Sequence, residues 1–471
     1  MIEIMLMKTQ LLKKMLLVPM CIAIIGCSSK IKIIDSPVSL PGNFSKSGNE
    51  ILPEKWWMSF NDPNLNGLMN EAIGNNFSIL SAWDRLTQAE QIAVKRGADL
   101  FPKINYTSDA SRNRRETLKT KKYSSNFSAG LTLSYEVDLW GEIRSSQQAA
   151  VLDAIAAQED VYAAAITLTS SVAKTWYQLA EVKQATTVLN QQVISNQNVL
   201  DIITTQFSKG KVGAADVYRQ QQLVESTRGK LIKAQESMVV LQHQLSVLLG
   251  KSPALSWKDE DIKLIKLPAF PETGLPSSTV QNRPDIQRAF KSIQAADKRV
   301  AVAIADQYPR LSIFVGVESS SDDIDNLFDD WVSNLTANVI GPLYDAGLRK
   351  AEVLRTKGTL SERINNYGQA ILVALKETED AISQEAYQKL YLDNLNQQLK
   401  LARQVYDSTE LNYLKGRLDY IRVLDSLVSQ QNLEITELNG RRVLIERRID
   451  LCKAIAGSWE IQRPEPKEIN N

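Results

Sequence analysis

The amino-acid sequence predicts a mixed membrane α+β fold, with long coiled-coil α-helices and four amphipathic β-strands arranged in two tandem structural repeats. Three observations lead to this prediction. Distant residues match at a nearly constant offset, about 68 consecutive residues contain neither glycine nor proline, and one stretch alternates apolar and polar residues over about 13 positions.

Composition excludes several classes of protein. The 471 residues carry a net charge of +1, which argues against a nucleic-acid partner. His243 is the only histidine, so a histidine-based metal site or a Ser/His/Asp triad within the chain is excluded. No glycine-rich phosphate loop or paired catalytic carboxylate is recognisable. We therefore expect no enzyme activity and no catalytic, cofactor-binding or metal-binding residues.

The N-terminus has the pattern of an export signal. Lysines precede a short apolar core that ends in Ile24-Ile25-Gly26-Cys27, which resembles the bacterial lipobox. We predict a lipoprotein signal peptide over residues 1–26 and a covalent lipid on Cys27. The alternatives are a secretory signal cut elsewhere, or a membrane anchor. Cys452, the remaining cysteine of the mature chain, occupies an apolar helical position typical of a packed core cysteine.

Two halves of the chain match each other. Gly210 and Gly416 are 206 residues apart, and Pro102 and Pro309 are 207 apart. Such an offset is too long for a solenoid repeat and predicts two domain-sized units. The predicted segments are a lipid-anchored segment 27–75, repeat one 76–250 with a β-hairpin 101–140 and a helical tip near 210, a linker 251–280, repeat two 281–457 with a β-hairpin 308–344 and a tip near 416, and a tail 458–471.

Each half contains a long helix. Residues 142–209 would extend on the order of 100 Å as one helix. Within this stretch, mainly apolar residues from Val172 to Phe207, with Asn196 among them, alternate spacings of three and four, which is the seam of a coiled coil. Polar residues on the same helix are expected to line water or to lie on the outside, such as Gln191, Gln192, Asn196 and Gln197.

Each half also contains a pair of strands. In NFSAGLTLSYEVDLW, apolar residues from Phe127 to Leu139 alternate with polar ones, the pattern of a strand with lipid on one face and water on the other. The other three strands are expected in KINYTSDAS, RLSIFVGVE and WVSNLTANVIGPLY. Four strands cannot close a barrel, so we expect several chains to share one. Three chains would give twelve strands, and the residues alone do not exclude two or four.

The motifs EKWWMSFNDPNLNGLMNEAIGNN, YEVDLWGEIR, NRPDI, QYPRL and KGRLDYIRVLDS, together with the lipobox, resemble the TolC family of outer-membrane efflux factors, in particular its lipoprotein (NodT-type) branch, which serves resistance-nodulation-division pumps. The resemblance implies a homotrimer whose twelve-stranded β-barrel in the outer membrane of a Gram-negative bacterium continues as an α-helical periplasmic tunnel. It places the linker 251–280 in an equatorial region.

The resemblance also implies a function and partners. The chain would be the passive exit duct of a tripartite efflux system, with a periplasmic adaptor (membrane fusion) protein and an inner-membrane pump as partners, outer-membrane lipid around it, and a gated periplasmic mouth. The alternatives are a duct for type I protein secretion and a pore-less periplasmic coiled-coil lipoprotein. The substrate cannot be read from the sequence.

The predicted site is the periplasmic mouth. Gly210 and Gly416 would stop two helices in left-handed turns, and each returning helix needs an N-cap, for which Gly213 and Asp419 are suited. Ile421 and Asp425 are four residues apart on the second returning helix and share a face.

The resemblance implies that three copies of Asp425 form a carboxylate ring at the constriction. It also marks Asp216 and Tyr413 as candidate latch residues, with Arg417 and Arg422 nearby. Asp216 is a candidate partner of Arg417 across neighbouring hairpins. The chain departs from the family pattern in two places. The latch arginine would fall at Leu418, one position after Arg417, and Arg422 replaces a second acid.

A basic run, RRETLKTKK, separates the first two predicted strands, and an acidic run, SSSDDIDNLFDD, separates the last two. We expect both runs to form solvated surface loops. For the basic run, a contact with anionic lipopolysaccharide is the functional alternative.

Overall fold

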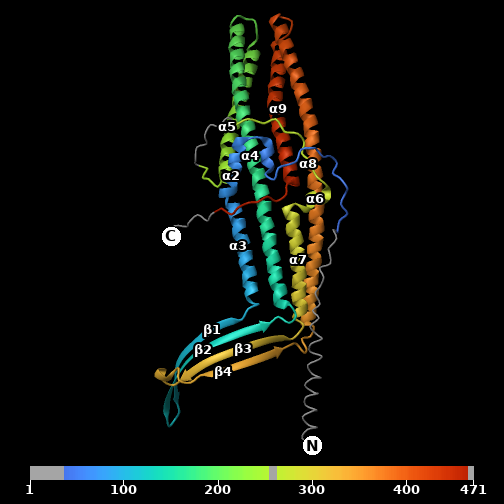
Figure 1. The fold of residues 1–471 in the computed structure, drawn as a ribbon. Helices are drawn as coiled ribbons and strands as arrows, with labels where there is room; N and C mark the ends of the chain where they lie inside the picture. Colours follow the sequence, from blue (N-terminus) through green and yellow to red (C-terminus); the bar gives the residue numbers. More distant parts are fainter. Residues whose placement is uncertain (1–36, 254–261, 465–471) are drawn as a thin grey trace. The chain divides into compact units, whose positions relative to one another are not determined.

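The computed structural model describes residues 37–253 and 262–464. Its elements are the 3₁₀-helix η1 (Trp56–Phe60), helices α2 (Pro63–Asn75) and α3 (Phe77–Ala98), strands β1 (Lys103–Glu116) and β2 (Lys121–Val137), helices α4 (Glu142–Ser208), α5 (Ala214–Leu248), α6 (Pro276–Gln281) and α7 (Pro284–Ala305), strand β3 (Arg310–Ser321), 3₁₀-helix η2 (Ile324–Asn326), strand β4 (Val332–Ile340), and helices α8 (Leu348–Leu414) and α9 (Tyr420–Ile455) (Figure 1).

The helix lengths confirm the two tandem structural repeats. Helices α4 and α8 both contain 67 residues, and their first residues, Glu142 and Leu348, are 348 − 142 = 206 positions apart. Helices α3 and α7 both contain 22 residues and begin 284 − 77 = 207 positions apart. None of the helices in the described ranges is apolar enough over a sufficient length to span a membrane.

The chain forms two compact units that do not coincide with the repeats. One unit includes residues 91–151 and 293–365, and therefore all four strands and the helix ends next to them. The other includes residues 40–90, 152–292 and 366–471, and therefore both helical hairpins. Each unit therefore contains segments of both repeats.

The four strands form one antiparallel sheet in the order β1-β2-β3-β4 (Figure 1). Directly opposed residues share a face, and one face is mainly apolar, as in the row Ile104, Leu133, Val315 and Leu335. The opposite face carries residues such as Asn105 and its partner Thr132. The sheet therefore has the two-sided character that the alternation predicts.

Aromatic residues lie at both ends of the sheet. At the helical end, Trp140 stacks on Tyr308 with ring centroids 4.7 Å apart, and the Trp140 Nε1 donates to the Pro309 carbonyl at 2.7 Å. At the end with the hairpin turns, Phe328 stacks on Trp331 at 5.9 Å. All four rings are substantially exposed, a distribution typical of the two interfaces of a membrane.

The basic run between β1 and β2 differs from the expected loop. Strand β1 continues to Glu116 and β2 begins at Lys121, so only residues 117–120 form the turn. Backbone pairing along both strands extends the hairpin through most of the charged segment. High charge density favoured a loop in the sequence, but cross-strand pairing stabilises extended backbone despite it.

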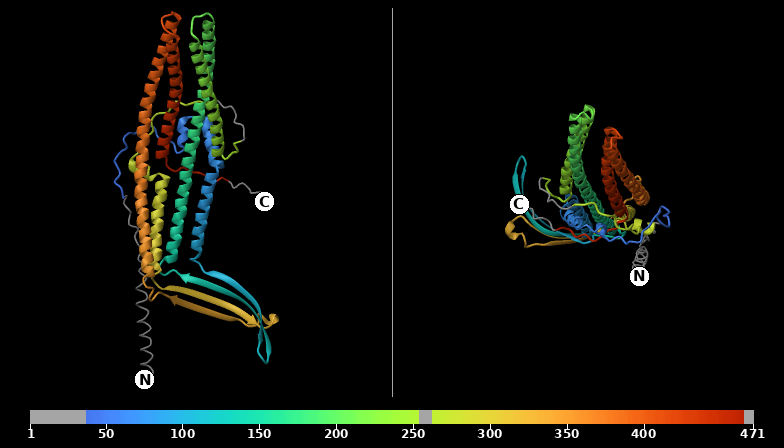
Figure 2. Two further views of the ribbon diagram at one scale, coloured as in Figure 1. Left: turned by 180° about the vertical axis from the view of Figure 1, so that it is seen from behind. Right: turned by 90° about the horizontal axis from the view of Figure 1, so that it is seen from above.

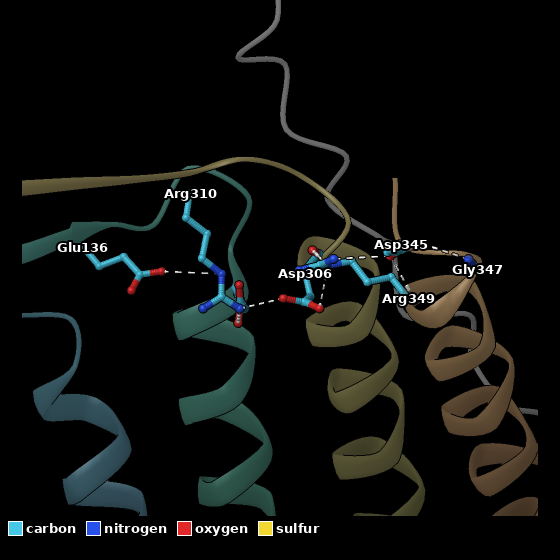
Figure 3. A network of polar contacts seen from close by, with 7 residues as sticks. Glu136, Asp306, Arg310, Asp345, Gly347 and Arg349 are labelled. Carbon is cyan, nitrogen blue, oxygen red and sulfur yellow. Dashed lines mark hydrogen bonds and ion pairs between the residues drawn. The ribbon is translucent and has the colours of Figure 1, made fainter. Parts of the chain in front are cut away.

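An ion-pair network joins helix ends to strand β3 in the same unit (Figure 3). Arg310 Nη2 lies 2.7 Å from both Glu142 Oε1 and Asp306 Oδ1. Arg349 links Asp306, at 3.1 Å, to Asp345, at 3.3 Å. Partial burial raises the pKa of Glu142, and the positive charge of Arg310 opposes this rise. The network ties the ends of α4, α7 and α8 together at the base of the sheet.

In the other unit, the hairpins α4–α5 and α8–α9 stand side by side with both tips at the same end (Figures 1 and 2). Polar contacts join α4 of the first hairpin to α9 of the second. Lys174 pairs with Asp450 at 2.5 Å, and Gln178 donates to Glu446 at 2.8 Å.

The core of this unit is built around the motif that contains two tryptophans. Trp56, Trp57 and Phe60 are almost fully buried, and Trp56 makes edge-to-face contacts with both Trp57 and Phe60. Asp62 caps α2 by accepting from the backbone of Leu65 at 3.1 Å, and its other oxygen accepts from Trp176 Nε1 on α4 at 2.8 Å. One carboxylate therefore fixes both the start of α2 and its position on α4.

The NRPDI motif also has a structural role. Arg283 is 9% exposed and donates to Asp285 at 2.8 Å, to Glu377 at 2.7 Å and to the Ala454 carbonyl at 3.3 Å. It thereby joins the start of α7 to α8 and to the end of α9. Cys452 is buried as predicted, and burial raises the pKa of its thiol to about 12.

Candidate functional site at the hairpin tips

The two hairpin turns have the same backbone structure. Gly210 has a φ of 67° and Gly416 a φ of 68°, which are left-handed values that glycine adopts without a Cβ penalty. The amide of Lys211 donates to the Gln206 carbonyl at 2.9 Å, and the amide of Arg417 donates to the Asn412 carbonyl at 2.9 Å. Both turns are therefore Schellman motifs, with Gly210 and Gly416 as the left-handed residues.

The returning helices begin at the predicted N-caps. Gly213 and Asp419 both have extended backbone, with ψ values of 161° and 151°, and neither provides a side-chain capping bond. In the first turn of α5, the Asp216 carboxylate accepts from the Gly213 amide at 3.4 Å and lies 3.4 Å from Arg219 Nη1. The contacts of Asp216 therefore lie within the first turns of α5, the helix to which it belongs.

Apolar residues from both hairpins form one cluster beneath the turns. Ile203, Val217, Tyr420, Val423 and Leu424 are its buried members. The partly buried members are Val199, Leu200, Val212, Leu223, Tyr406, Tyr413 and Ile421. The cluster holds the two tips against each other within a single chain.

Tyr413 joins the two tips by a hydrogen bond. Its hydroxyl donates to Gln206 Oε1 at 2.6 Å, and its ring lies 5.7 Å from that of Tyr420. Burial raises the pKa of Tyr413, and the nearby negative charge of Asp216 raises it further. Tyr413 and Asp216 therefore lie close together, as the latch hypothesis requires, but the hydrogen-bond acceptor of the tyrosine is Gln206. Sequence reasoning did not identify Gln206.

The predicted ring residues lie on the first turns of α9. Asp425 is exposed, whereas Ile421 is partly buried in the tip cluster. Arg417 in the turn and Arg422 in the first turn of α9 are both exposed. Within the described part of this single chain, none of these three charged residues forms an ion pair, so the intramolecular partner of Asp216 is Arg219 rather than Arg417. Cys27 lies outside the described residues.

A buried polar layer lies farther from the tips and connects three helices. Asn196, which is 0% exposed, donates to Thr227 on α5 at 3.0 Å and exchanges two hydrogen bonds with Gln431 on α9, at 3.2 and 2.9 Å. Gln220 donates to the Asn196 carbonyl at 2.7 Å and accepts from the Tyr420 hydroxyl at 2.5 Å. This layer was not predicted.

The burial of this layer corrects one expectation from the sequence. Gln192 and Asn196 neither line water nor lie outside, because both are buried and hydrogen-bonded to α9. In a low-dielectric interior such satisfied amides specify one arrangement of helices, since any shift would leave them unpaired.

A groove of about 780 Å³ lies beside this layer, between α4, α8 and α9. Its lining includes Arg403, which approaches Glu434 at 3.5 Å, and Arg441, which approaches Glu437 at 3.9 Å. The buried Gln430 Oε1 has no hydrogen-bond partner there. Among residues 37–253 and 262–464, no cluster of three or more His, Cys, Asp or Glu side chains is arranged to hold a metal ion.

The chain is similar to known proteins over almost its whole length. The model of the family described as outer membrane efflux protein matches residues 68–251 and 275–457. The pyoverdine export outer membrane protein OpmQ of Pseudomonas aeruginosa is 27% identical over 96% of this chain and 98% of its own length. The cation efflux system protein CusC of Escherichia coli K12 is 26% identical over 94% of this chain and 99% of its own.

A further relative and a solved structure are also similar to the chain. The probable outer membrane lipoprotein SilC of Salmonella typhimurium is 26% identical over 90% of this chain and 94% of its own length. Among solved structures, the outer membrane channel CmeC of Campylobacter jejuni superposes with a TM-score of 0.84 at 23% identity, over 92% of this chain and 94% of that one. OpmQ, CusC and CmeC are named as an export protein, an efflux protein and a channel, and SilC is named as a probable outer membrane lipoprotein.

Proposed function

The chain belongs to the outer membrane efflux protein family, and we propose that three copies of it form one exit duct through the outer membrane and into the periplasm. The observation that carries the proposal is the four-stranded sheet, in which, among the described residues, β1 pairs only with β2 and β4 only with β3. Two open edges and one apolar face are untenable in hydrocarbon unless other copies close the sheet. Twelve strands from three chains make a closed, even-numbered barrel with a polar lumen.

The proposed gate lies at the hairpin tips. Three copies of Asp425 form a carboxylate ring with Ile421 beside it, and this ring favours cations over anions at the narrowest point. Tyr413, Asp216, Arg417 and Arg422 form the latch that keeps the tips together. The exposure of Asp425, Arg417 and Arg422 in a single chain supports a role between chains.

The proposed partners are a periplasmic adaptor (membrane fusion) protein and an inner-membrane resistance-nodulation-division pump. The duct is passive, and the pump supplies the energy. The relatives include a pyoverdine export protein and a cation efflux protein. Proteins of one family are thus named for very different substrates. We therefore place the choice of substrate in the pump and not in this chain.

The proposed anchor is a lipid on Cys27, added after removal of residues 1–26. The name of one relative, a probable outer membrane lipoprotein, supports this anchor. Replacement of Cys27 by alanine should abolish incorporation of labelled palmitate into the mature protein, and unchanged labelling would contradict the assignment.

The test of the duct is planar-bilayer recording with the purified full-length oligomer, combined with its mass in native mass spectrometry. A trimer mass together with discrete cation-preferring conductance supports the proposal. A dimer or tetramer that conducts would contradict the subunit number, and an oligomer that never conducts would leave the pore-less lipoprotein as the function.

A further inference from the structure

The β1–β2 hairpin extends beyond the rest of the sheet. Pairing between β2 and β3 ends at Phe127 and Ser321, whereas pairing between β1 and β2 continues to Glu116 and Lys121. The extension, residues 111–126, is here called the basic arm, and it projects past the β3–β4 turn in Figure 1.

The cations of the basic arm divide between its two faces. Arg112 and Arg114 alternate in step with Ile104 and Tyr106 and therefore continue the apolar face of the sheet. Their cross-strand partners on the same face are Ser125 and Tyr123. Lys121 lies two residues before Tyr123 and therefore shares this face. The apolar face thus ends in two arginines, one lysine and one aromatic ring.

Two other cations, Arg115 and Lys122, oppose each other on the other face, which is the polar face of the sheet. They carry the same type of charge as Arg112 and Arg114, and they lie in the same arm, slightly nearer to the hairpin turn. Arg115 and Lys122 therefore provide a control, because they place positive charge on the opposite face of the same arm.

The contacts on the apolar side leave positive charge available. The Arg112 guanidinium lies 5.7 Å from the centre of the Tyr123 ring. Glu116 forms an ion pair with Arg114 and another with Lys121, the latter at 3.0 Å. One carboxylate thus faces three cations, and the Arg114 and Lys121 side chains remain 50% and 60% exposed.

These cations lie at the depth expected for lipid headgroups. A tilted strand crosses the hydrocarbon core in about 9–11 residues, and Arg112 is the tenth residue of β1. Arginine binds phosphate oxygens in bidentate fashion, and tyrosine favours the membrane interface. We propose that Arg112, Arg114 and Lys121, beside Tyr123, bind the phosphate groups of an anionic lipid in the outer leaflet.

The second hairpin lacks these features. Its turn carries Asp322, Asp323 and Asp325 and no cation, so it repels a phosphate group. Each chain therefore provides one lipid contact, at the basic arm only. The inference rests on the proposed function insofar as the sheet must lie in the outer membrane with its hairpin turns outward.

The experiment measures binding of diphosphoryl lipid A to the full-length oligomer by native mass spectrometry. The variant Arg112→Ala/Arg114→Ala should bind about tenfold more weakly, because charge-assisted hydrogen bonds are lost. The control variant Arg115→Ala/Lys122→Ala loses the same charge from the opposite face and should change the affinity by less than about twofold.

Three results would overturn the proposal: equal weakening in both variants, equally tight binding of dephosphorylated lipid A, and displacement of the lipid by an equal concentration of inorganic phosphate. Bilayer conductance of the Arg112→Ala/Arg114→Ala variant separates the two hypotheses. If the variant conducts normally while lipid A binds wild type and variants equally, the duct stands and the lipid contact fails. Absence of conductance in the wild type would instead refute the duct.

Discussion

The two hairpin tips have the same backbone and different side chains. In both, a glycine with positive φ closes a Schellman turn and an extended N-cap follows three residues later. Beyond the turn, the first copy carries Asp216 and Arg219, and the equivalent positions of the second carry Arg422 and Asp425 in reversed order. The backbone of the turn is therefore shared, whereas the order of the charged side chains differs between the copies.

The same contrast holds in the hydrogen bonds between the copies. Tyr413 donates to Gln206, but its equivalent in the first copy, Phe207, has no hydroxyl. Asn196 anchors the buried polar layer, but its equivalent in the second copy is Ala402. The duplicated chain has thus become asymmetric in the residues that join one copy to the other.

The largest effect is expected from Asn196→Ala, which makes the first copy resemble the second. It leaves the buried amide of Gln431 and the hydroxyl of Thr227 with fewer partners, at a cost of about 2–3 kcal/mol in the free energy of unfolding. Urea denaturation measures this loss. The exposed Asn198→Ala is the matched control and should stay within about 0.5 kcal/mol, and equal values for the two variants would show that the layer adds no stability.

The next largest effect is expected from Gly210→Ala and Gly416→Ala. No atom lies within 4 Å of a Cβ added at either glycine, so the cost is backbone strain alone. We expect about 1–2 kcal/mol in each variant. The same denaturation measurement should give the same value for both, and a clear difference would show that the two turns are not equivalent.

Tyr413→Phe should have a smaller effect. It removes the hydrogen bond to Gln206 and gives both copies a phenylalanine at this position. We expect a loss of about 1 kcal/mol and a higher open probability in single-channel recordings. Phe207→Tyr adds a hydroxyl to the other tip and should not reproduce the effect. Unchanged gating in Tyr413→Phe would remove the tyrosine from the latch.

The smallest change in stability is expected from Asp425→Ala, because the side chain is exposed and unpaired within the described chain. Its effect belongs to the pore: higher conductance and weaker cation preference, further increased when combined with Asp216→Ala. Arg219→Ala, at the equivalent position of the first copy, should leave the cation preference unchanged. If Asp425→Ala keeps both the conductance and the selectivity of wild type, the proposed carboxylate ring is wrong.

The sequence was sufficient where the structure depends on local rules. The turns at Gly210 and Gly416 follow from a backbone conformation that glycine favours, and the offset places them in both copies. The apolar face of the sheet follows from a period of two, because a shift of one residue in register would move the apolar side chains to the polar face.

The rest depended on contacts between distant residues. Asn196 was placed correctly on the helical seam, yet its partners Thr227 and Gln431 are 31 and 235 residues away. A polar seam residue can face water or a buried partner, and only the packing of three helices decides between them. For the same reason, Tyr413 could be selected as a latch residue while its acceptor Gln206 could not.

The equal length of α4 and α8 limits how this chain can change during evolution. One residue inserted into either helix rotates everything beyond it by about 100°, which would turn Tyr413 or Asn196 away from its partner. Insertions of seven residues restore the seam, but only if both copies acquire them, since otherwise the tips no longer meet. The two 67-residue helices can therefore change in length only together, and we expect variation in length to occur in the turns and strands instead.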